Sequence, residues 1–109
     1  VQPEKYISQE ERALNHYHAM VLLNPRDAFP LIKLGDFSAY KVSIVNDKHL
    51  LESCELEQEG PYRLLSSGER LVYDWLVLDA IVNYKHSLEL RPDDGQVHFN
   101  LGSAYSATK

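Results

Sequence analysis

The chain has 109 residues, of which 44% are hydrophobic and 25% are charged. These values are typical of one soluble globular domain, and they exclude the low-apolar, high-charge composition of disordered chains. The net charge of −5 argues against nucleic acid as a partner, because binding to a phosphate backbone depends on a basic surplus. The single cysteine, Cys54, excludes an intramolecular disulfide and is compatible with a reducing compartment, so we expect a cytoplasmic protein.

A first helix is predicted from about residue 8 to residue 24. Ala13, Tyr17 and Met20 share one face of it, because residues four and seven positions apart lie on the same side of a helix. Pro25 ends this helix, since proline lacks a backbone donor and restricts the residue before it.

A second helix is predicted over residues 28–40, with Asp27 in place to cap it. Leu34 follows the helical spacing of apolar residues, and Gly35 lies in the helix interior. An interior glycine costs about 1 kcal/mol relative to alanine. We therefore expect a neighbouring helix to approach the backbone closely at Gly35.

The middle of the chain, residues 41–66, does not continue this pattern. Lys41–Val45 alternates over a stretch too short to predict a strand, and Asp47–Glu57 indicates a short acidic helix. One interpretation is a degenerate repeat with helices near residues 46–57 and 61–74. We favour the other, an inserted segment, because a degenerate repeat would place Asp47 and Leu51 where a small residue and an aromatic belong, and no turn residue near Trp75–Val77 separates two helices. Long structureless segments in compact domains are usually functional, so residues 41–66 are a candidate for the part peculiar to this protein.

Two further helices are predicted, over residues 67–90 and 95–108. The long one opens at Ser66, whose spacing to Glu69 fits a capping box, and it ends before Pro92.

Two stretches of the chain match each other. Residues 13–38 align with residues 80–105 at a constant offset of 67, with seven identities in 26 positions, more than composition alone supplies. Each stretch consists of a helix, a tight turn at proline and a second helix. The identical pairs are Ala13 and Ala80, Tyr17 and Tyr84, Leu23 and Leu90, Pro25 and Pro92, Asp27 and Asp94, Leu34 and Leu101, and Gly35 and Gly102.

The second stretch has a distinctive spacing. It is Ala80-x3-Tyr84-x2-Ser87-x4-Pro92, followed by Asn100-Leu101-Gly102-x2-Tyr105. This spacing resembles the tetratricopeptide repeat, and residues 13–35 look like a second copy. The resemblance implies an all-α fold in which antiparallel helix pairs stack as a right-handed superhelix with a concave groove. It also implies that the repeat positions, Tyr105 and Gly102 included, pack in the seams between helices.

In the resembled family the groove is lined by the first helix of each pair. Asn100 is then expected to bond the backbone of a bound peptide, because an amide offers both a donor and an acceptor. The set of residues that clamps a C-terminal carboxylate is missing, since Asp36 and Gln96 stand where that clamp needs Asn and Lys. The candidate groove residues are Phe29, Ile32, Lys33, Asp36, Tyr40, Gln96, Phe99, Asn100 and Ser103.

No catalytic residue, metal site or cofactor is predicted. His16 and His18 are two positions apart and point to different sides of a helix, whereas metal ligands on a helix are three or four apart. Acidic neighbours disfavour the thiolate of Cys54. The longest apolar run, Leu71–Val82, is too short and too interrupted to span a membrane.

We therefore expect a non-enzymatic module that binds a peptide or helix of another protein. The net charge favours a basic or neutral partner segment. The acidic stretch Asp47–Glu59 is expected to be a solvated helix face; if it is functional, it steers a basic partner. Two alternatives stay open: a targeting or substrate-binding region of a larger multidomain enzyme, or an architectural segment that associates with itself through exposed terminal repeats. The start at Val1 and the helical pattern at Lys109 predict a section cut from a longer helical array.

Overall fold

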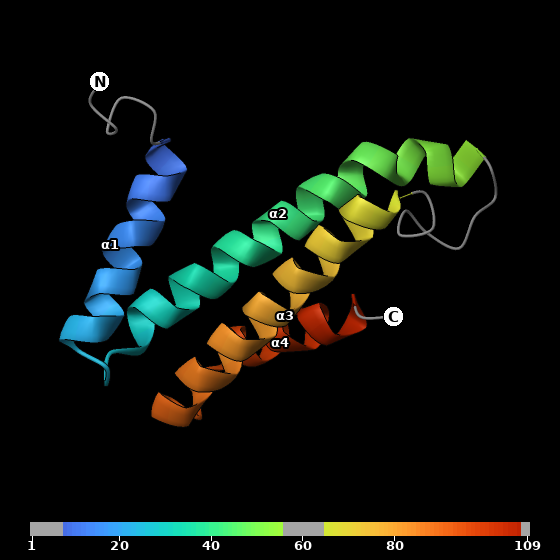
Figure 1. Ribbon diagram of the computed structural model, residues 1–109. Coiled ribbons are helices and arrows are strands. Elements are labelled where there is room, and N and C mark those ends of the chain that lie inside the picture. The colour runs from blue at the N-terminus through green and yellow to red at the C-terminus, as the bar shows by residue number, and fades with distance from the viewer. Residues whose placement is uncertain (1–7, 56–64, 108–109) are drawn as a thin grey trace, which may run out of the picture.

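The computed structural model describes residues 8–55 and 65–107, and it describes the side chains of these residues except within 46–55. This part of the chain is entirely helical apart from turns and caps, so the all-α prediction is confirmed (Figure 1). The helices are α1 (Gln9–Leu23), α2 (Ala28–Glu55), α3 (Ser67–Leu90) and α4 (Gly95–Ser106).

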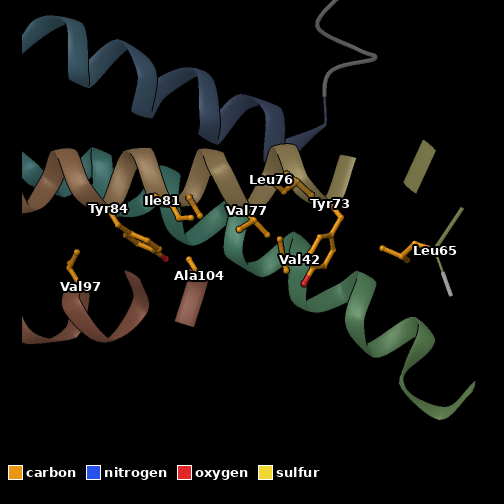
Figure 2. Close-up of a cluster of buried hydrophobic side chains, with 10 residues drawn as sticks. Val42, Leu65, Tyr73, Leu76, Val77, Ile81, Tyr84, Val97 and Ala104 are labelled. Atoms are coloured by element: carbon orange, nitrogen blue, oxygen red, sulfur yellow. The ribbon is translucent and has the colours of Figure 1, made fainter. Parts of the chain in front are cut away.

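Helices α2 and α3 form a long antiparallel pair, which is the centre of the fold (Figure 1). Helix α4 packs against α3, and α1 packs against α2 beside the turn that joins them. The apolar core lies between α2, α3 and α4, where Tyr84 of α3 lies near Val97 and Ala104 of α4 (Figure 2). Tyr84 and Val97 are each only 1% exposed, so both side chains are fully enclosed where these three helices meet.

Side-chain caps begin the helices where the sequence predicts them. The Oγ of Ser66 accepts a hydrogen bond from the N–H of Glu69 at 3.2 Å, and the Glu69 carboxylate accepts one from the N–H of Ser66 at 3.0 Å. Asp27 and Asp94 accept hydrogen bonds from the backbone N–H groups at the starts of α2 and α4. These bonds satisfy donors that a helix leaves unpaired in its first turn.

Helix α2 does not end at residue 40 as predicted, but continues to Glu55. The degenerate repeat is therefore wrong for residues 41–55, which form no separate helix. The inserted segment is expected to begin after the helix ends at residue 40, but residues 41–55 lengthen that helix, which pairs with the helix over 67–90. No glycine or proline interrupts this stretch, and Val42 is buried in the core together with Tyr73 and Val77 of α3. Val45, further along the same stretch, also packs against this core. Residues 56–64 lie outside the described residues.

The close approach predicted at Gly35 is confirmed. A Cβ atom at this position would lie 2.7 Å from Cε1 and 2.9 Å from Cδ1 of Tyr84, so the tyrosine ring of α3 rests directly on the backbone of α2. The same prediction is wrong for Gly102, because no described atom lies within 4 Å of a Cβ placed there. Tyr105, predicted to pack in a seam, is 48% exposed.

The remaining repeat positions divide between seams and turns. The small residues Ala80 and Ser87 are buried in α3, and Leu34 is buried in α2. Ala13, Tyr17 and Leu101 are half-buried, whereas the two turn prolines, Pro25 and Pro92, are exposed.

The two repeat glycines allow a matched test of packing. We expect Gly35→Ala to lower the free energy of unfolding by about 1–3 kcal/mol, because the added methyl group overlaps a buried ring. Gly102→Ala should instead raise it by up to about 1 kcal/mol, since alanine favours the helix and meets open space. Urea denaturation of both variants at micromolar concentration measures the difference, and a Gly35→Ala protein as stable as the parent would contradict this packing.

Candidate binding cavity between helices α2, α3 and α4

A cavity of about 440 Å³ opens between α2, α3 and α4. Its volume falls in the range of sites that take up small molecules or the side chains of a bound segment. Most of its wall consists of small or apolar side chains. The lining residues are Asp36, Ala39, Tyr40, Val42 and Ser43 from α2, Val77, Ala80 and Tyr84 from α3, and Asn100, Ser103, Ala104 and Ala107 from α4 and its C-terminal cap.

A connected set of polar groups lies in this wall. The hydroxyl of Tyr84 donates a hydrogen bond to Oδ1 of Asp36 at 2.6 Å, and Nδ2 of Asn100 lies 3.5 Å from the same oxygen. Gln96 in turn donates from Nε2 to Oδ1 of Asn100 at 2.9 Å. One carboxylate is thus held by neutral donors from two other helices, which gives it a defined position in the cavity.

The environment keeps the Tyr84 hydroxyl protonated. Burial raises the pKa of Tyr84 well above its usual value, the hydrogen bond to Asp36 and the charge of that carboxylate raise it further, and Asn100 has a smaller opposing effect. Tyr84 therefore acts as a hydrogen-bond donor at neutral pH. The hydroxyls of Ser43 and Ser103 donate to backbone carbonyls of their own helices. The cavity wall thus presents one negative charge and several hydrogen-bonding groups, an arrangement suited to binding.

A second, smaller cavity of about 290 Å³ adjoins the first, between α1 and α2. Asp36 and Tyr40 contribute to both cavities, so the two are neighbours along α2. Each residue that lines the smaller cavity has its partner at the offset of 67 in the larger one. The pairs are Tyr17 and Tyr84, Lys33 and Asn100, Asp36 and Ser103, Phe37 and Ala104, and Tyr40 and Ala107.

The structure brings six of the candidate groove residues into or beside these cavities. Four line the larger cavity, Lys33 lines the smaller one, and Gln96 contacts Asn100. The four are Asp36, Tyr40, Asn100 and Ser103.

The other three candidates lie elsewhere. Phe29 packs against Tyr17, with ring centroids 6.2 Å apart, and the ammonium of Lys33 lies 5.4 Å from the Phe29 centroid. Ile32 is half-buried against the core, and Phe99 is 70% exposed on the outer side of α4. The two phenylalanines therefore do not line either cavity.

Two features escaped the sequence analysis. The polar role of Tyr84 had no local signal, because its partner Asp36 lies 48 positions away. The other is an exposed apolar stripe on α3, formed by Leu71, Trp75, Leu78 and Val82. Their spacing of four, three and four residues marks one helix face, and counting it would have found the stripe.

Within the described ranges, no three or more His, Cys, Asp or Glu residues are grouped so as to hold a metal ion. None of the described helices combines the length and apolar content that crossing a bilayer requires. No family model, curated protein or solved structure matches this chain. The resemblance to tetratricopeptide repeats therefore rests on the spacing within the chain itself.

Replacing Tyr84 with phenylalanine tests the polar set. Tyr84→Phe should lower the free energy of unfolding by about 1–3 kcal/mol at neutral pH, because it removes a hydrogen bond to a charged group. Since the pKa of Tyr84 is higher in the folded than in the unfolded chain, the parent should also lose stability as the pH rises above about 10, where only the unfolded phenol ionises. The difference in stability between parent and variant should shrink over that range in urea denaturation. A difference that is independent of pH would contradict the assignment.

Proposed function

We propose that this chain is a protein-binding module and that the cavity between α2, α3 and α4 receives a side chain of a bound protein segment. The observation that carries the proposal is the carboxylate of Asp36, held by Tyr84 and Asn100 in a cavity whose other lining residues are uncharged. Among the described residues that line this cavity there is no lysine or arginine to neutralise it. A cationic group of the partner complements that charge.

The apolar walls provide the rest of the interaction. Val42, Val77 and Ala80 line the cavity beside Asp36. The side chains of lysine and arginine carry a long apolar stem and a charged head, so they match a cavity with apolar walls and one acidic group. Burial of the stem contributes affinity, and the ion pair contributes specificity.

The adjoining cavity favours an elongated partner over a small molecule. The two cavities meet at Asp36 and Tyr40, so they offer consecutive positions to one segment that lies across α2. Lys33 and Asp36 both line the smaller cavity and their charges are opposite, so the partner residue there is neutral. Asn100 lines the larger cavity, and we assign its amide to a contact with the backbone of the segment. The resemblance to peptide-binding repeats supports the same proposal.

Selection from a display library of random peptides tests the proposal without a known partner. We expect the selected peptides to be enriched in lysine or arginine and to bind more weakly as the salt concentration rises. Asp36→Asn keeps an acceptor oxygen for Tyr84 but removes the charge, so it should weaken binding about tenfold, which corresponds to about 1.4 kcal/mol. Isothermal titration calorimetry measures both effects.

A second variant tests the location of the bound peptide. Ser103→Trp should block binding because it fills the larger cavity. Gly68→Trp is the matched control, because Gly68 has open space around it and lies at the start of α3, outside the lining of both cavities. Selected peptides that are acidic, or whose affinity neither Asp36→Asn nor Ser103→Trp changes, would refute the proposal.

A further inference from the structure

Among the described residues, no helix packs on the face of α4 that is equivalent to the α2 face against α3. In α2, Gly35 lies under the ring of Tyr84, and Ser38 is buried where its hydroxyl donates to a carboxylate of α3. The equivalent residues of α4, 67 positions later, are Gly102 and Tyr105, and both are exposed. The face of α4 that is equivalent to the α2 face buried against α3 keeps the glycine, and no described helix packs against it.

Two further pairs of equivalent residues also differ in exposure between α2 and α4. Leu31 is buried in α2, and its equivalent His98 is exposed. Ile32 packs against the core, whereas its equivalent Phe99 is 70% exposed. The exposed face of α4 thus includes a notch at Gly102, with the side chain of Phe99 nearby on the same helix.

Helix α1 also lacks a described helix on one side. It is the equivalent of α3, yet none of its residues is buried. Tyr84 lies between α2 and α4, but its equivalent Tyr17 meets rings only on the α2 side, at centroid distances of 6.2 Å from Phe29 and 6.0 Å from Phe37. The described structure places no helix on the other side of Tyr17, where Tyr84 has Gly35.

Among the described residues, the smaller cavity lacks one of the three walls that the larger cavity has. The larger cavity has walls from three helices, and α2 supplies one of them through Asp36, Ala39 and Tyr40. The smaller cavity has walls from α1 and α2 alone. By the offset of 67, the missing wall corresponds to α4, because the equivalents of Ala39 and Tyr40 are Ser106 and Ala107.

We propose that a second copy of this chain covers the exposed face of α4, and that the exposed face of α1 is covered in the same way. Helix α4 of one copy packs against α1 of the next as α2 packs against α3, with the ring of Tyr17 on the backbone at Gly102. Both halves of this junction belong to this chain, and each is the equivalent of a half that is already packed within it. The second copy also supplies the third wall of the smaller cavity. Because α1 and α4 are different surfaces, the association is head to tail, and it extends as a filament or closes as a ring.

A pair of blocking variants tests the junction. Gly102→Trp fills the notch on α4, and Ala13→Trp blocks α1 at the equivalent of the buried Ala80. The parent should increase in mass between about 10 µM and about 1 mM in sedimentation equilibrium, a range that reports dissociation constants from micromolar to millimolar. Each variant alone should remain a monomer. An equimolar mixture should form a dimer and nothing larger, because only one intact junction remains.

Controls separate the junction from loss of folding and from other contacts. Gly102 has open space around it and α1 has no buried residue, so both variants should keep the helical circular dichroism of the parent. Gly102→Leu serves as a second blocking variant on α4, and Gly68→Trp should associate like the parent. A parent that is monomeric at about 1 mM would overturn the proposal. So would a mixture that stays monomeric, or association that persists in both variants, which would point to the apolar stripe around Trp75. The proposal does not depend on peptide binding at Asp36, so either can fail alone.

Discussion

The side chain of Tyr84 connects the core of this protein to its candidate site. Its ring lies against the backbone of α2 at Gly35, where any Cβ atom would overlap it, and its hydroxyl donates to Asp36, the next residue in the chain. Asn100 approaches the same carboxylate from α4. Tyr84 thereby links α3 to α2 and, through Asp36, to α4, and it does so at the wall of the larger cavity.

The hydrogen bonds to Asp36 prepare its carboxylate for a ligand. The carboxylate of Asp36 is already oriented by its neighbours, so little conformational entropy is lost when a ligand meets it. An apolar wall around one oriented charge allows the apolar contacts to contribute affinity and the charge to select among partners. The same hydrogen bonds contribute to folding, and substitutions at this site therefore need a measurement of stability beside the measurement of binding.

The number of helices packed against each helix explains why the helices differ in burial. In a structure built from stacked units, each helix is stabilised by its nearest neighbours. Helices α2 and α3 have neighbours along their length and bury large side chains, whereas α1 has α2 alone and buries none. The smaller cavity beside α1 is accordingly less enclosed by helices than its equivalent.

The local chemistry of the sequence was enough to predict the helices, most of their ends and the close approach at Gly35. Caps such as Ser66 and the turn prolines depend only on neighbouring residues, and the 67-residue offset is found by comparing the sequence with itself. These features can therefore be recognised without coordinates. The end of α2 could not be predicted in this way, because no glycine or proline marks it, and Val42, beyond the predicted end, is buried against α3 residues far away in sequence. The pairing of Tyr84 with Asp36 and the exposure of Gly102 also depended on tertiary structure. Contacts between residues far apart in sequence, and the lack of a neighbour at a surface, arise only when the helices are placed together in space.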